Sequence, residues 1–183
     1  RDDEVGGLLR YGIPNFKMEK GIIDRRIAIL KAEGILFKTN INVGVNYSVD
    51  ELKSFDSIVL CGGSTERRSL PTPGIDADGV VQAMDFLTQQ TKALFGKEVK
   101  DQIMATDKDV IVIGGGDTGS DCIGTSNRHG AKSVVNFEIM PKPPGERSAK
   151  TPWPFWPLQL KTSSSHKEGA NRNWLINTKE FVK

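Results

Sequence analysis

Cysteine and histidine are scarce in this chain, which has two of each among 183 residues. Cys61 and Cys122 form no C-x-x-C pair and no ligand cluster with the histidines, so the sequence predicts no metal site, no dithiol redox centre and no iron-sulfur cluster held by this chain alone. We expect both thiols to be buried as small apolar side chains. His129 and His166 are expected to be structural or solvated rather than catalytic.

Long hydrophobic runs and an excess of one charge are also missing. No apolar run approaches the ~20 residues that a membrane-spanning helix needs, and the opening letters RDDE are not those of a secretory signal. The formal net charge is only +2, which argues against nucleic acid or a membrane as a partner. A cytoplasmic location is therefore the default expectation. An initiator methionine is lacking too, since Arg1 opens the chain, and we expect a fragment of a longer protein.

The informative stretch runs from Asp109 to Glu138. The run Val110 to Ile113 is continuously apolar and β-branched, as in a strand buried on both faces of a parallel sheet. The next glycines match G-x-G-x-x-G. A helix is expected from about Thr118 to His129, ending at Gly130, and a second strand from Ser133 to Ile139. The pattern predicts an α/β fold, a Rossmann-like dinucleotide-binding domain with a parallel sheet.

This pattern also indicates which residues hold the dinucleotide. The helix N-terminus attracts the phosphates, and Glu138, about 20 residues beyond the last glycine of the motif, stands where a ribose 2′-hydroxyl is held. The predicted cofactor-binding residues here are Gly114, Gly115, Gly116, Asp117, Thr118, Gly119 and Glu138. A bare glycine turn and a methyltransferase are the alternatives within the same architecture.

Glu138 also bears on the choice between NADH and NADPH. An acidic side chain repels a 2′-phosphate, and no arginine occurs between it and Arg147, so NADH is favoured. The alternative is that Glu138 merely ends the strand and that Lys142 and Arg147 hold the phosphate of NADPH.

Elements of a second type precede this stretch. A glycine-rich loop at Gly6 and Gly7 comes first, and a strand from Asp56 to Leu60 runs into a second glycine turn, Cys61 to Thr65. The other expected elements are a helix over 20–34, extended pieces over 35–38 and 42–45, a short helix over 49–55 capped by Ser48, an irregular connection over 70–79, a helix over 80–94 and a loop over 97–108.

After Met140 the chain is rich in proline. Pro152, Pro154 and Pro157 alternate with Trp153, Phe155 and Trp156. A packed loop, lining the nicotinamide side, is favoured over a ligand for a proline-binding module, because exposed aromatic side chains are costly. Residues 162–172 are polar, and residues 174–182 are expected to form a short strand or helix.

Four segments together resemble the small, flavin-bearing subunit of glutamate synthase: GGLLRYGIPNFKMEK, VLCGGST, VIGGGDTGSDCIGTSNRHGAKSVVNFE and PWPFWP. The resemblance implies that Gly6, Gly7 and Gly63 lie along an FAD. It also implies that electrons pass from NADH or NADPH to FAD and on to iron-sulfur clusters and FMN in a large subunit or domain, where glutamine and 2-oxoglutarate give glutamate.

These patterns divide the chain into three parts. Residues 1–76 are expected to be an incomplete FAD-binding domain portion, 77–108 a connecting helix and linker, and 109–183 a C-terminally truncated NAD(P)H-binding domain. No catalytic side chain is expected, because cofactors carry hydride chemistry. Two functions remain open: the electron-input region of glutamate synthase, an NAD(P)H-dependent oxidoreductase, and a non-catalytic dinucleotide-binding module of a related flavoprotein.

Overall fold

A computed structural model describes residues 1–64, 66–68 and 70–182. The predictions that fall on Thr65, the end of the second glycine turn, and on Lys183 lie outside the described residues. The elements are α1 (Gly7–Tyr11), α2 (Lys20–Ala32), the 3-10 helix η1 (Val49–Ser54), α3 (Ala83–Leu94), β1 (Asp109–Ile113), α4 (Asp117–Arg128), β2 (Ser133–Glu138), α5 (Ser164–Glu168) and β3 (Asn171–Trp174).

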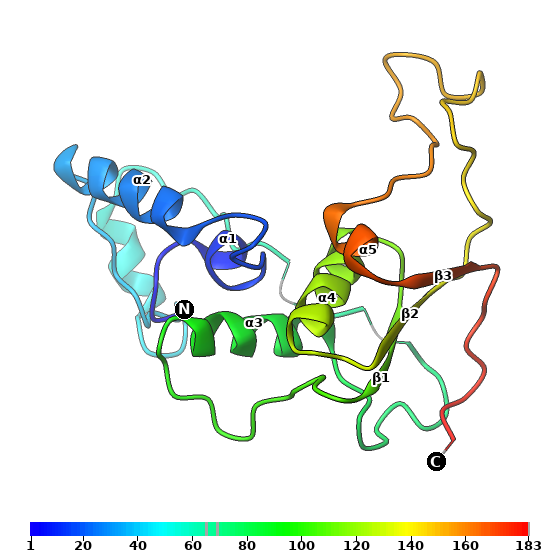
Figure 1. The fold of residues 1–183 in the computed structure, drawn as a ribbon. Coiled ribbons are helices and arrows are strands. Elements are labelled where there is room, and N and C mark those ends of the chain that lie inside the picture. The colour runs from blue at the N-terminus through cyan, green and yellow to red at the C-terminus, as the bar shows by residue number, and fades with distance from the viewer. Residues whose placement is uncertain (65, 69, 183) are drawn as a thin grey trace.

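The strands form one parallel, three-stranded sheet in the order β1-β2-β3. Helix α4 connects β1 to β2 and packs on one face of both, with α3 and α5 packed against α4 (Figure 1). The predicted α/β class with a parallel sheet is confirmed, and the strand, helix and strand of the glycine-motif stretch fall within one residue of the expected bounds.

The core lies between the helices and this one sheet face. Its buried residues come from α3, the segment before β1, both strands and α4: Phe86, Leu87, Ala105, Val112, Cys122, Ile123 and Val134. Helix α3, which the sequence assigns to a connecting segment, thus shares its core with the sheet. The expectation that β1 is buried on both faces is wrong, because Ile111 and Ile113 are 59% and 45% exposed on the face away from α4.

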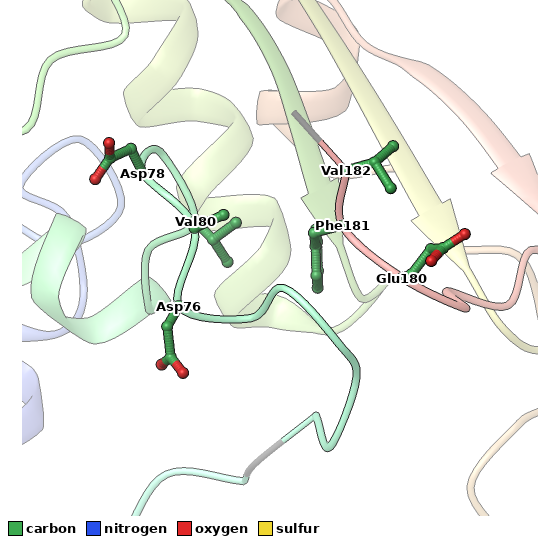
Figure 2. A pocket seen from close by; sticks show the side chains of 7 residues that line it. Asp76, Asp78, Val80, Glu180, Phe181 and Val182 are labelled. Carbon is green, nitrogen blue, oxygen red and sulfur yellow. The ribbon is translucent and has the colours of Figure 1, made fainter.

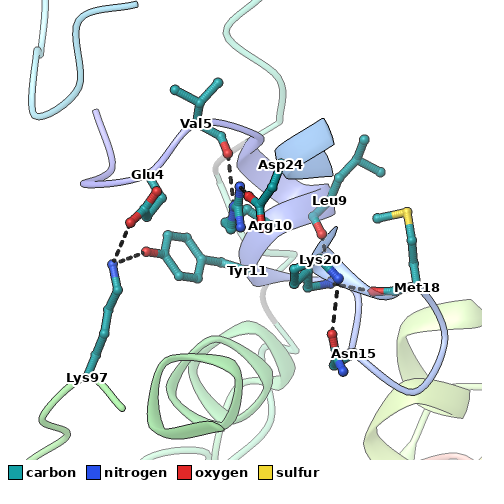
Figure 3. Close-up of polar contacts among 10 residues, drawn as sticks. All are labelled: Glu4, Val5, Leu9, Arg10, Tyr11, Asn15, Met18, Lys20, Asp24 and Lys97. Carbon is teal, nitrogen blue, oxygen red and sulfur yellow. Dashed lines mark hydrogen bonds and ion pairs between the residues drawn. The ribbon is translucent and has the colours of Figure 1, made fainter. Parts of the chain in front are cut away.

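Polar contacts, more than apolar burial, hold the N-terminal helices together (Figure 3). Lys20 begins α2, is 1% exposed, and donates from Nζ to the backbone carbonyls of Leu9, Ile13 and Met18. Arg10 of α1 pairs with Asp24 of α2. The Tyr11 hydroxyl accepts a hydrogen bond from Lys97 Nζ at 2.8 Å, which joins α1 to the segment after α3.

Three expectations for the N-terminal part have different outcomes. The short helix capped by Ser48 is confirmed, since the Ser48 side chain accepts from the Asp50 amide. The expected strand over 56–60 is wrong: no ladder forms there within the described residues, and Val59 and Leu60 are 82% and 88% exposed. A strand is stable only when a neighbour takes up its backbone hydrogen bonds. The 35–38 and 42–45 pieces are irregular apart from one isolated bridge between Val43 and Tyr47.

The proline-rich segment forms a long excursion between β2 and β3 (Figure 1). The expected packed loop is wrong, because Trp153, Phe155 and Trp156 are 82%, 66% and 78% exposed. None of these side chains belongs to the buried core cluster of the described residues.

The C-terminal end differs from expectation as well. Residues 175–182 are irregular, and the strand lies earlier, at β3. The Phe181 amide donates to the carbonyl of Pro73 at 2.9 Å. Residues 180–182 and 76–80 together line a shallow hollow, shown in Figure 2. Among the described residues that line it, Asp76, Asp78 and Glu180 supply carboxylates.

Candidate functional site: the glycine turn after β1

The turn between β1 and α4 is tied to β2 by hydrogen bonds. Gly114 has φ +117, which favours glycine, and its amide donates to the carbonyl of Phe137 at 2.8 Å. The fully buried Asn136 side chain donates from Nδ2 to the carbonyls of Val112 and Gly114, at 3.0 and 2.9 Å. A side chain on β2 therefore fixes where the glycine turn leaves β1. Asn136 was not singled out from the sequence, although a polar side chain within an otherwise apolar strand indicates a buried hydrogen-bonding role.

The glycines of the motif differ in their surroundings. A Cβ added at Gly119 would lie 2.2 Å from the Gly114 carbonyl oxygen, so the helix and the turn approach closely there. One added at Gly115 would lie 2.1 Å from the Glu138 carboxylate. At Gly116 an added Cβ would meet no described atom within 4 Å. Gly119 and Gly115 thus serve internal packing, whereas Gly116 borders open space at the helix N-terminus.

That helix N-terminus fits a phosphate. Gly116 is the N-cap of α4, and no side chain caps it within the described part of the chain. The first helical bond runs from the Ser120 amide to the Gly116 carbonyl, so the amides of Asp117, Thr118 and Gly119 stand free of intrahelical partners, as the first turn of any helix requires. These donors and the helix dipole suit an anion. The cradle of glycines and open amides therefore fits the pyrophosphate of a dinucleotide.

The predicted acid lies at the same edge of the sheet. Glu138 ends β2, and its carboxylate lies against Gly115. Glu138 Oε1 accepts from Arg172 on β3 at 2.8 Å, and the two side chains are only 14% and 12% exposed. Sequence reasoning missed Arg172, because it searched for basic residues directly after β2 and not on the next strand.

The structure brings together the predicted residues from Gly114 to Gly119 and Glu138, but not the others. Gly6 is the N-cap of α1 and Gly7 its first residue, with φ of +126 and +52, and Gly63 lies in an irregular segment with φ +70. Gly6 packs against Arg10 and Ile23, whereas added Cβ atoms at Gly7 and Gly63 would meet no described atom within 4 Å. Their role along an FAD stays a prediction.

Both histidines make structural contacts. His129 accepts the Ala105 amide on Nδ1 at 3.3 Å, contacts Gln90 Oε1 through Nε2 at 2.7 Å, and packs edge-on against Phe86. Burial lowers its pKa. His166 completes the capping box of α5 with Ser163. Burial, and to a smaller extent the charge of Arg172, lowers the pKa of His166.

The two cysteines lie in different environments. Cys122 is buried in the core, and burial raises the pKa of its thiol to about 12, which keeps it protonated. Cys61 is exposed, so the expectation that both are buried is wrong for this residue. No cluster of metal ligands occurs among residues 1–64, 66–68 and 70–182, and in this same part of the chain no helix is long and apolar enough to cross a membrane.

A model of the pyridine nucleotide-disulphide oxidoreductase family matches residues 15–150, which include α2, the glycine turn, α4 and β2. The chain belongs to this family. Over all of its length it is also 49% identical to the glutamate synthase (NADPH) small chain of Mycobacterium tuberculosis and 50% identical to the glutamate synthase (NADH) of Schizosaccharomyces pombe.

A third relative is the glutamate synthase (NADPH) small chain of Bacillus subtilis, which is 51% identical over 86% of this chain. The chain spans only part of each relative: 38% of the mycobacterial protein, 9% of the fission-yeast protein and 32% of the Bacillus protein. The resemblance to the glutamate synthase small subunit is thereby confirmed.

Proposed function

We propose that this chain is the electron-input region of a glutamate synthase and binds NADH or NADPH at the turn between β1 and α4. The observation that carries the proposal is the open space over Gly116, bordered by the free amides of α4 and by Glu138 at the end of the neighbouring strand. Relatives at about half identity that are named as glutamate synthases support it.

In this proposal the protein contributes binding and position. The amides of Asp117, Thr118 and Gly119 hold the pyrophosphate, Gly116 lets the backbone approach it, and Glu138 accepts from the ribose. The nicotinamide and the flavin supply the hydride chemistry when bound, so no acid, base or nucleophile is required of this chain.

The wider activity belongs to the same proposal. Residues 1–76, with Gly6, Gly7 and Gly63, form part of an FAD-binding domain, 77–108 connect it, and 109–183 form the NAD(P)H-binding domain. Electrons from FAD reach iron-sulfur clusters and FMN in a large subunit or domain. Glutamate is made there from glutamine and 2-oxoglutarate, in the cytoplasm.

We propose NADH as the preferred coenzyme, because the Glu138 carboxylate lies against the glycine turn and would repel a 2′-phosphate. The relatives at about half identity are named for either coenzyme, so their names do not decide. Tighter binding of NAD⁺ than of NADP⁺ to the complete protein that carries this chain is expected in calorimetry. The reverse order would contradict the preference.

The glycine at the helix N-terminus gives the direct test. Gly116→Ala adds a methyl group where the pyrophosphate meets the backbone, at a φ of −79 that alanine adopts freely. We expect unchanged thermal stability and roughly tenfold weaker NAD⁺ binding, about 1.4 kcal/mol. Calorimetry on the complete protein measures this.

Gly21→Ala is the matched control. It adds the same methyl group in open space on α2 and should leave NAD⁺ affinity unchanged. Wild-type affinity in Gly116→Ala would refute the site. Reduction of the flavin by NADH in the same complete protein separates the enzyme from a non-catalytic binding module.

A further inference from the structure

The carboxylate at the end of β2 is held by an arginine from a strand much later in the chain. Asn136 pairs with Arg172, and Glu138 with Trp174, in the parallel register of β2 and β3. Register partners point to the same face of a sheet, and Asn136 points to the α4 face, where it is fully buried. Arg172 therefore reaches Glu138 on the face that carries the glycine turn.

Arg172 is itself fixed from several directions. One terminal nitrogen donates to Glu138 Oε1 at 2.8 Å, and the other donates to the carbonyl of Lys161 at 2.9 Å. Its guanidinium lies 5.1 Å from the ring centroid of Trp174. A planar guanidinium held in this way presents a fixed donor to the carboxylate.

The two oxygens of Glu138 have different surroundings. Oε1 accepts the hydrogen bond from Arg172. Oε2 lies against Gly115, and a Cβ added at Gly115 would be 2.1 Å from this oxygen. A carboxylate oxygen has lone pairs for more than one donor. With Oε1 engaged, the side chain keeps the orientation that turns Oε2 toward the glycine turn.

We propose that Arg172 is a positioning residue for coenzyme recognition: it holds Glu138 so that Oε2 accepts from the 2′-hydroxyl of the adenosine ribose. This inference rests on the proposed dinucleotide site and adds a residue of β3 to the residues that form it. Arg172 acts through Glu138 and not on the coenzyme directly. The recognition of the ribose thus depends on the pair, not on the acid alone.

The test compares NAD⁺ with the analogue that lacks the 2′-hydroxyl of the adenosine ribose. In calorimetry on the complete protein, wild type is expected to bind NAD⁺ about tenfold more tightly than the analogue, as one hydrogen bond to a charged group allows. Arg172→Met should bind the two with equal affinity. A merely structural defect would weaken both ligands by the same factor and keep the tenfold ratio.

Three further variants complete the comparison. Glu138→Ala should also bind NAD⁺ and the analogue with equal affinity. Adding Arg172→Met to Glu138→Ala should change the NAD⁺ affinity no further, because the arginine acts only through the carboxylate. Arg172→Lys keeps the positive charge but not the planar guanidinium, so it should bind NAD⁺ more tightly than the analogue by less than tenfold. This variant replaces Arg172→Met in the test if Arg172→Met does not fold.

The matched control is Arg128→Met. It removes an arginine from another Arg–Glu pair, with Glu168, at the far end of α4, and should keep the full ratio. A full tenfold ratio in Arg172→Met would overturn the inference while leaving the proposed site intact. If wild type binds NAD⁺ and the analogue with equal affinity, Glu138 does not recognise the 2′-hydroxyl and the inference is overturned. The Gly116→Ala variant separately tests whether the dinucleotide binds at this turn at all.

Discussion

Two segments of this chain have nearly the same pattern and different structures. Residues 58–63 read IVLCGG, and residues 111–116 read IVIGGG. The second forms the end of β1 and the glycine turn, whereas the first is irregular, with Val59 and Leu60 exposed. The two runs share apolar, β-branched character, so propensity does not separate them.

The difference arises from the chain on the C-terminal side of each segment. After residue 116 the chain forms α4 without a proline, and β2 then returns beside β1. After residue 63 the chain reaches Pro71 and Pro73, which prevent a comparable helix, and no described strand lies alongside. A strand is decided by its partner as much as by its own residues.

Gly119→Ala is expected to have the largest effect. Its methyl group would meet the Gly114 carbonyl oxygen, a backbone atom, at 2.2 Å, so we expect a loss of about 3 kcal/mol in the free energy of unfolding. Urea denaturation measures it. Gly63, a glycine of the irregular segment, has φ +70, and a Cβ added there would meet no described atom within 4 Å. Gly63→Ala should cost only about 1 kcal/mol, the strain of a left-handed backbone. Equal costs would mean that the turn after β1 is no more constrained than its irregular counterpart.

Asn136→Leu tests the side chain that ties the glycine turn to β2. The change removes the donor to the Val112 and Gly114 carbonyls, and a loss of about 2 kcal/mol is expected, since buried acceptors lose their partner. Asn173→Leu, at an exposed position on β3, is the control and should stay within about 0.5 kcal/mol of wild type. A stable Asn136→Leu protein would show that the backbone ladder alone fixes the turn.

The losses in the free energy of unfolding caused by Val112→Ala and by Val59→Ala should differ by less than those of the pairs above. Val112 is 8% exposed in the core, and losing two methyl groups there should cost about 1.5 kcal/mol. Val59 is 82% exposed, so its truncation should change the free energy of unfolding by less than about 0.5 kcal/mol. A matching loss at Val59 would reveal that residues 58–60 are packed in solution.

The sequence alone was sufficient to predict the strand–helix–strand unit of β1, α4 and β2, which positions the candidate site. An apolar strand run, the glycine motif and a Gly-capped helix are local signals, and they predict β1, α4 and β2 to within one residue. Glu138 could be placed at the edge of the glycine turn for the same reason.

Features that depend on distant contacts could not be predicted in this way. The strand β3 reads NRNW, with no apolar alternation, and forms because β2 offers it an edge. Arg172 was missed with it. The loop aromatics and Cys61 were expected to be buried from their chemistry alone, but burial depends on whether another segment covers them.

The parallel order β1-β2-β3 has a consequence for the time course of folding. β1 and β2 are joined by a single helix, whereas β3 reaches β2 only after the whole proline-rich excursion has closed. Short loops close sooner than long ones. We infer that the glycine turn and Glu138 assemble early as one local unit, and that Arg172 docks in a later step. During that interval Glu138 would already lie at the glycine turn, but without the ion pair to Arg172.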